Sequence, residues 1–340
     1  MTESRLEEIL DRIARARIAV VGDFCIDAYW ELDTGEREIS LETGKPTYGV
    51  RSQRYAPGGG GNVAANLAAL GTGRVRAFSV IGPDLFGREL LLLLGRRGID
   101  TSGIVVQDSS WETPVYAKPY TGETEEERID FGRWNVMRSD GPLSERIGGA
   151  LPELDCLVVN QQLSDGVHSP GMIRMLNESA RMHGTTVFIV DARTMSDLFT
   201  GMITKLNAKE AARLAPGREG EPASLTPDLL RAYAREIAQR SGKPVFVTRS
   251  AEGILLYDGK AFTDLPAPAL KGPIDPVGAG DATVAAIAAC LAAGGTLSEA
   301  GEFGNIAASV TVQKLKETGT ATPGEIRLAR RRAGNLPLKE

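Results

Sequence analysis

Residues 275–294 constrain the fold more than any other stretch of this sequence. They read Asp-Pro-Val-Gly-Ala-Gly-Asp and continue as Ala-Thr-Val-Ala-Ala-Ile-Ala-Ala-Cys-Leu-Ala-Ala-Gly. The second part predicts a helix that is apolar nearly all round, and such a helix has to be buried. The first part predicts a turn of small residues that runs straight into the helix. The rest of the chain therefore has to build its core around this segment.

The first turn of this helix has the features of an anion site. At Gly278, Ala279 and Gly280, backbone N–H groups and the positive end of the helix dipole face outward with almost no side chain in the way. Asp281 lies in the same turn. Its carboxylate could cap the helix, which is the commoner use of such a residue, or accept a proton from a hydroxyl that attacks a bound phosphate. The turn alone leaves both uses open.

Composition favours a globular protein that handles small molecules. The chain has 340 residues, 42% of them hydrophobic, which is enough for one large α/β domain or two smaller ones. A formal net charge of −5 argues against nucleic acid or an anionic membrane as the main partner. No apolar run approaches the roughly 20 residues of a membrane span, and the first residues are charged rather than signal-like. Cys25, Cys156 and Cys290 fall in hydrophobic runs at wide spacing, which predicts buried free thiols in the cytoplasm.

Apolar runs alternate with helical patterns along most of the chain. The predicted strands cover 18–21, 75–81, 155–160, 186–191 and 244–248, with helices near 86–97 and 171–181 among them. This β–α alternation predicts a doubly wound, mostly parallel sheet flanked by helices, in one domain spanning 1–340. Asp23 and Asp27 follow the first strand, where open sheets bind ligands, but as bare residues they are equally well explained as turn formers.

Two further segments, 31–56 and 104–137, lack helical periodicity. They predict extended segments of a small β layer outside the main sheet, which could serve as a lid or be an ordinary excursion of strands. Between them, residues 57–66 read Pro-Gly-Gly-Gly-Gly-Asn-Val-Ala-Ala-Asn. This glycine-rich turn is neither a Walker loop nor a dinucleotide fingerprint, because no Gly-Lys-Ser/Thr follows and the third glycine is misplaced.

Residues 57–66 and 275–281 resemble the two signatures of the PfkB (ribokinase-like) family of sugar kinases. The first is in the variant that marks the heptose-phosphate kinase branch, and the second departs only in Pro276, where many members have Thr. The resemblance extends from Val21 to about Thr322. It implies ATP as phosphoryl donor, a sugar or sugar phosphate as acceptor, Mg²⁺ as cofactor with a monovalent cation as a further candidate, and a homodimer formed through the β lid.

The resemblance also implies roles for residues at the reacting end of the site. Asp281 would be the general base, and in the turn that begins at Gly278 the amides of Ala279, Gly280 and Asp281 would hold the developing charge. For the sugar, Asp27 would accept hydrogen bonds from hydroxyls, with Gly58, Gly59 and Asn62 lining the same site. Arg193 could meet a phosphate on the substrate or pair with Asp197.

Roles for the nucleotide follow from the same resemblance. Asn207 and Glu210 match an Asn-x-x-Glu motif that would order Mg²⁺ through water. As a bare pattern, the two residues predict a helix start in which Asn207 is the cap and Glu210 its partner three residues later. We expect both uses together. The remaining nucleotide contacts would be Thr248, Gly253, Asp275, Gly280 and Asn305.

Two departures concern the sugar rather than the chemistry. Residues 160–162 are Asn-Gln-Gln where heptose kinases have Ser-Asp-Tyr, and 191–193 are Asp-Ala-Arg where the family tends to have Asp-Pro-Lys or Asp-x-Arg. A nucleoside or small-vitamin kinase on the same fold, and a sugar- or nucleotide-binding protein without turnover, remain alternatives. Intact Asp281, Asn207 and Glu210 argue against the loss of turnover.

Overall fold

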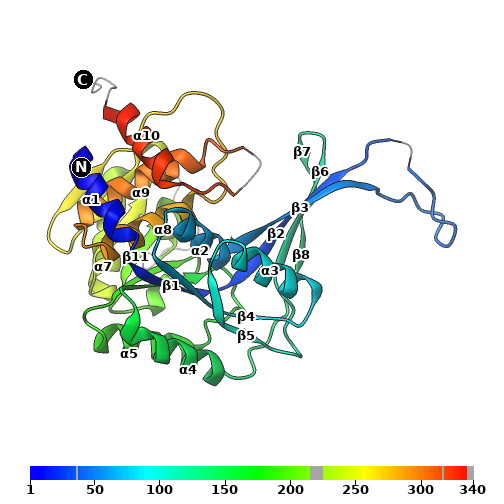
Figure 1. The fold of residues 1–340 in the computed structure, drawn as a ribbon, viewed down its shortest axis with the longest axis horizontal. Helices are drawn as coiled ribbons and strands as arrows, with labels where there is room; N and C mark the ends of the chain where they lie inside the picture. The colour runs from blue at the N-terminus through cyan, green and yellow to red at the C-terminus, as the bar shows by residue number, and fades with distance from the viewer. Residues whose placement is uncertain (36, 215–224, 316–317, 335–340) are drawn as a thin grey trace.

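The computed structural model describes residues 1–35, 37–214, 225–315 and 318–334 (Figure 1). Its centre is a nine-stranded sheet in the order β14-β13-β12-β11-β10-β9-β1-β4-β5. The strands are β1 Arg17–Gly22, β4 Arg74–Ile81, β5 Asp100–Val106, β9 Cys156–Gln161, β10 Val187–Ala192, β11 Ile203–Asn207, β12 Val245–Thr248, β13 Ile254–Tyr257 and β14 Phe262–Leu265. All neighbours from β5 to β12 pair in parallel, and only the pairings of β13, with β12 and with β14, are antiparallel. The predicted doubly wound, mostly parallel sheet is confirmed.

Helices cover both faces of this sheet, which explains why its strands are apolar without alternation. One face carries α1 Glu3–Ile13, α2 Gly60–Ala69, α3 Leu85–Gly95, α8 Ala279–Ala292, α9 Leu297–Thr311 and α10 Pro323–Gly334. The other face carries α4 Gly141–Ala150, α5 Pro170–Met182, α6 Ala208–Arg213 and α7 Pro227–Ser241. Helix α8 is buried at every position from Ala282 to Cys290, as its apolar composition predicts. Among the described residues, no helix is both long and apolar enough to cross a membrane.

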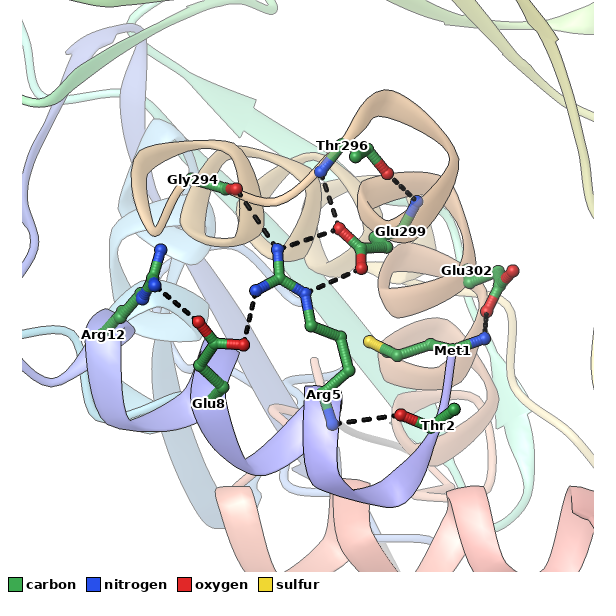
Figure 2. A network of polar contacts seen from close by, with 9 residues as sticks. All are labelled: Met1, Thr2, Arg5, Glu8, Arg12, Gly294, Thr296, Glu299 and Glu302. Atoms are coloured by element: carbon green, nitrogen blue, oxygen red, sulfur yellow. Dashed lines mark hydrogen bonds and ion pairs between the residues drawn. The ribbon is translucent and has the colours of Figure 1, made fainter.

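A polar network at the start of the chain holds α1 against the α8–α9 turn (Figure 2). Arg5 donates from Nε to Glu299 at 2.8 Å and from Nη1 to Glu8 at 2.6 Å. Glu299 also completes a capping box with Thr296 at the start of α9. Because α9 packs along α8, these contacts also stabilise the position of α8.

A second, smaller sheet projects from the body of the molecule (Figure 1). It consists of β2 Phe24–Leu32, β3 Val50–Gly59, β6 Val115–Thr121, β7 Thr124–Glu125 and β8 Ile129–Phe131, ordered β3-β2-β6-β7 with β8 also on β6. It differs from the predicted β layer at three boundaries. Its first strand begins at Phe24 and its second ends at Gly59, whereas 104–106 belong to β5 of the large sheet. Residue 36 of the predicted layer lies outside the described residues.

The early start of β2 has a simple physical cause. Residues 24–28 are buried, like those of β1, so the hydrophobic pattern runs through Asp23 without interruption. Asp23 turns the chain between the two sheets, because its carboxylate accepts backbone N–H groups from Gln162, Leu163 and Val167 at 2.8, 2.8 and 2.9 Å. Asp23 is therefore the turn former of the two aspartates, and Asp27 is carried onto the small sheet.

Candidate active site

The turn before α8 leaves backbone donors unpaired. Gly278 precedes the helix with φ +78°, and no side chain caps the helix start. The first helical bond is donated by Ala282 to Gly278 O. Ala279 donates to Pro276 O at 3.2 Å, so its N–H is already used. Within the described residues, the N–H groups of Gly280 and Asp281 have no partner, which narrows the predicted anion site to these two amides.

Among the described residues, no backbone N–H of this turn donates to the Asp281 carboxylate, so the capping alternative is not seen. The carboxylate instead accepts a hydrogen bond from Asn62 Nδ2 at 2.8 Å. Asn62 lies in the first turn of α2 and is oriented by Asn66, whose Nδ2 donates to Asn62 Oδ1 at 3.1 Å. The two signature segments of the sequence, 57–66 and 275–281, therefore meet at one hydrogen bond.

The surroundings of Asp281 favour its protonated form. Burial raises the pKa of Asp281 to about 7, with further increases from the charges of Asp191 and Asp27, while the Asn62 hydrogen bond and Lys205 act in the opposite direction. A carboxyl group that titrates near neutral pH can take up a proton during a reaction and release it afterwards.

The small sheet brings a second carboxylate to the site. Asp27 Oδ1 lies 3.2 Å from Lys118 Nζ of β6, and both side chains are almost fully buried. Gly58 lies on the neighbouring strand β3, paired with Cys25, and a Cβ there would approach Asp27 Oδ2 to 2.8 Å. Gly59 has φ +55°, and its Cβ would clash with Asp23 O at 2.4 Å. These glycines are thus explained by the close packing of the small sheet around Asp27.

Arg193 directly follows β10. Its backbone N–H donates to Gln161 O at 3.0 Å, and its side chain is exposed. Among the described residues, no ion pair joins it to Asp197, so the predicted alternative of a simple local pair is not seen. Burial raises the pKa of Tyr116 on β6, and the charge of Arg193 opposes that effect. Arg193 therefore lies within electrostatic range of the small sheet.

Asn207 and Glu210 form the predicted helix cap at the start of α6. Glu210 N–H donates to Asn207 Oδ1 at 2.9 Å, and Asn207 N–H donates to Glu210 Oε2 at 2.8 Å. The sequence prediction of a capping box is confirmed. Within the described residues, no group of three His, Cys, Asp or Glu side chains is placed to hold a metal directly. Any role for this pair in metal binding would run through water.

The other residues that the sequence predicts to contact the nucleotide lie around the edge of the large sheet. Thr248 ends β12, and Gly253 has φ +86° where a Cβ would approach Leu265 O to 2.2 Å. Asp275 Oδ1 accepts from Val277 N at 3.0 Å, within the turn before α8. Asn305 is buried, and its Nδ2 donates to the backbone oxygens of Leu265 and Pro266. Asn305 therefore holds the segment that follows β14.

A cavity of about 670 Å³ lies one turn further along α9 than Asn305. Its lining residues come from the segment after β14 and from α9 and α10, and include Pro268, Leu270, Ser309, Gln313, Leu328 and Arg332. The structure thus offers open space beside Ser309 and Gln313, while the Asn305 amide is committed to the backbone.

The family model for pfkB family carbohydrate kinases matches residues 15–323. The chain belongs to this family. Curated relatives include the bifunctional protein HldE of Pectobacterium atrosepticum, 31% identical over 314 residues, which cover 92% of this chain and 63% of that protein. HldE of Salmonella dublin is 32% identical over 321 residues, covering 94% and 64%. The chain therefore spans just under two thirds of the length of these relatives.

Solved structures of a ribokinase and a phosphofructokinase share this fold. Ribokinase of Arabidopsis thaliana, solved with ribose and ATP, superimposes with a TM-score of 0.73 at 20% identity, over 93% of this chain and 98% of that one. Phosphofructokinase-2 of Escherichia coli gives 0.73 at 21% identity, over 94% and 100%. Both support the ribokinase-like fold that the sequence predicts.

Sequence reasoning missed two lysines of this kinase fold, Lys118 and Lys205. Each is a buried lysine within a strand, and each pairs with a buried aspartate, Asp27 and Asp191 respectively. The available signal was a lone lysine inside an apolar β pattern, at Tyr-Ala-Lys-Pro and Ile-Thr-Lys-Leu. A charge at such a position has to be paired when buried.

The raised pKa of Asp281 predicts a pH-dependent stability. Since its folded-state pKa of about 7 exceeds the ordinary value of 3.8, Asp281 favours folding below pH 4 and loses that contribution as pH rises through 7. Asp281→Asn cannot titrate but keeps an oxygen acceptor for Asn62. As the pH rises from 4.5 to 8, the melting temperature of the parent should therefore fall relative to that of the variant, with both measured by calorimetry. A constant difference across this range would contradict the assigned pKa.

Proposed function

We propose that this protein is a sugar kinase that transfers the γ-phosphoryl group of ATP to a hydroxyl of a sugar or sugar phosphate, in the manner of heptose-phosphate kinases. The observation that carries the proposal is the turn at the start of α8. There, one helical turn holds a carboxylate with a pKa of about 7 and two N–H groups that have no partner in the part of the chain that the structure describes. In-line phosphoryl transfer needs those two elements, a proton acceptor for the hydroxyl and donors for the transferred group.

In this mechanism the reacting hydroxyl lies against Asp281. Its oxygen attacks the γ-phosphorus, the bond to the bridging oxygen of ADP breaks, and the hydroxyl proton passes to the Asp281 carboxylate. The amides of Gly280 and Asp281 bind the oxygens of the phosphoryl group, with Gly278 keeping the turn open. Asn62 fixes the Asp281 carboxylate in place through its Nδ2.

Asp27 and Arg193 are proposed to select the sugar. The pairing with Lys118 fixes the orientation of the Asp27 carboxylate and leaves lone pairs for the hydroxyls of the substrate. Gly58 and Gly59 allow the backbone to approach the ligand, and Asn62 borders the same space. The exposed guanidinium of Arg193 suits a phosphate carried by the acceptor, because it is not used by Asp197.

ATP is proposed to lie along the carboxyl ends of the parallel strands, from the first turn of α8 to the cavity beside α9. The triphosphate would pass Thr248 and Gly253, with Asp275 supporting the turn, and the base would enter the 670 Å³ cavity next to the segment held by Asn305. Glu210 keeps one carboxylate oxygen free of the capping bond, so it and Asn207 supply the oxygen chemistry that suits Mg²⁺ bound through water. When bound, Mg²⁺ neutralises charge on the nucleotide phosphates. A monovalent cation is a second candidate cofactor.

The decisive experiment compares the parent with Asp281→Asn. ATP consumption is measured against a panel of free and phosphorylated sugars, with nucleosides and vitamins included, and the best acceptor is used for both proteins. The variant should lose turnover by roughly 10² to 10⁴, the usual contribution of positioned proton transfer, while ligand binding survives. A variant that keeps more than about half of the parental rate would remove Asp281 from the mechanism. A parent that is inactive with every acceptor would favour a binding protein.

The small sheet is proposed to act as the lid of this site, formed by 24–32, 50–59 and 115–131. Closure over the sugar would exclude water from the reaction. Hydrogen exchange should therefore slow in these three segments when the acceptor binds, with the amino-terminal helix α1 as an internal control that stays constant. Unchanged exchange with the site saturated would show that the sheet is a fixed excursion.

The lid is also the proposed surface of a homodimer. Leu41 and Tyr48 lie in the segment that joins β2 to β3, and Val50 begins β3. Their side chains are 97%, 58% and 50% exposed. Burial of such side chains between two copies would contribute to association. The free, buried Cys25, Cys156 and Cys290 support a reducing compartment, for which the cytoplasm is proposed.

A further inference from the structure

Lys205 lies directly against the turn that begins α8. It belongs to β11, is 4% exposed, and its Nζ would be 3.1 Å from a Cβ placed on Gly280. A Cβ at this distance would be tighter than ordinary contact, so the glycine lets the ammonium group lie close against this turn. The ammonium of Lys205 and the N–H groups of Gly280 and Asp281, which have no partner among the described residues, thus come together from two separate elements.

A row of polar side chains lies beside this lysine, and Asp191 holds it in place. Asn160, Asp191 and Lys205 are register neighbours on β9, β10 and β11. Lys205 Nζ lies 2.8 Å from Asp191 Oδ2, and both side chains are buried. Asn160 is fully buried, and among the described residues neither atom of its side-chain amide has a hydrogen-bond partner.

This arrangement is unfavourable as a purely structural device. Apolar residues of similar size in place of a buried ion pair are often neutral or stabilising, and an unpartnered buried amide costs free energy. Apart from Gln161 and Thr204, the remaining buried residues of strands β9, β10 and β11 are apolar. Polar side chains gathered at their carboxyl ends, below an anion-binding turn, therefore point to ligand binding rather than to packing.

Charge balance at the turn gives Lys205 a specific task. Asp27, Asp191 and Asp281 all contribute negative charge there, which would repel the triphosphate of ATP. Lys118 is committed to Asp27. Burial lowers the pKa of Lys205, but the charges of Asp191, Glu210 and Asp281 outweigh this effect and raise it overall, so the ammonium persists at neutral pH.

We propose that Lys205 is a catalytic residue whose ammonium group binds oxygens of the phosphoryl group during transfer, beside the amides of Gly280 and Asp281. This inference rests on the proposed kinase function. An ammonium group has three N–H donors, and Asp191 takes one, so two remain for phosphoryl oxygens. Lys205 keeps its proton throughout, since the hydroxyl proton goes to Asp281. Asp191 is a positioning residue that aims the ammonium.

The first test is Lys205→Met, with Lys243→Met as the matched control. Lys243 is exposed and lies just before β12, at the amino end of the strand. Lys205→Met should lower kcat/KM for ATP by roughly 10² to 10³, the loss seen when one preorganised donor is removed. Calorimetry should show a larger loss of affinity for ATP than for ADP, because only the γ-phosphoryl group meets the ammonium. Lys243→Met should match the parent in both measurements.

A second variant separates catalysis from folding. Lys205→Met leaves the buried Asp191 charge unpaired, which is strongly destabilising, whereas Lys205→Met with Asp191→Asn removes both charges. The double variant should recover melting temperature but not turnover. Asp191→Asn alone should move the acidic limb of the pH–rate profile to lower pH, because it removes a negative charge that raises the pKa of Asp281; Lys205→Met should move the limb to higher pH.

The outcomes distinguish this inference from the proposed function. A double variant that regains parental turnover together with its melting temperature would overturn a catalytic role for Lys205. Equal losses of ATP and ADP affinity in Lys205→Met would overturn it as well. If the parent transfers phosphate to no acceptor, the proposed function fails, and the ATP-over-ADP preference in binding still decides whether Lys205 meets the γ-phosphoryl group.

Discussion

The hydrogen bond from Asn62 Nδ2 to the Asp281 carboxylate is the contact on which the site depends. It joins the first turns of α2 and α8, two helices that begin at opposite ends of the sequence and pack beside each other on one face of the large sheet. Helix α2 begins where β3 of the small sheet ends, so the same bond ties that sheet to the α8 turn. Loss of this contact would separate the proposed proton acceptor from the proposed sugar side of the site.

The buried charged residues below the first turn of α8 lower the stability of the fold. Asp191 and Lys205 are both buried, and the Asn160 amide beside them lacks a partner among the described residues. The same negative charges, together with burial, raise the pKa of Asp281 to about 7. Without these surroundings, a carboxylate in this turn would be a weak base. The environment that lowers the stability of the fold therefore also suits Asp281 for the proposed proton transfer.

Local patterns predicted the elements whose signals lie within one segment. The buried helix α8, the parallel sheet and the Asn207–Glu210 capping box all follow from spacing and composition, and the structure confirms them. The boundaries of the small sheet were less predictable, because the apolar pattern does not mark the change of sheet at Asp23. The pairs Asp27–Lys118 and Asp191–Lys205 join separate strands, and such partners are set by register rather than by neighbouring sequence.

The central claim is that phosphoryl transfer takes place at the first turn of α8. The most direct measurement is a crystal structure of the protein with its acceptor, Mg²⁺, ADP and aluminium fluoride, which mimics the phosphoryl group in transit. The account predicts that the fluoride ligands contact the amides of Gly280 and Asp281, with an acceptor hydroxyl within about 2.6 to 3.2 Å of the Asp281 carboxylate. A complex in which the acceptor hydroxyl and the aluminium fluoride lie away from this turn would contradict it.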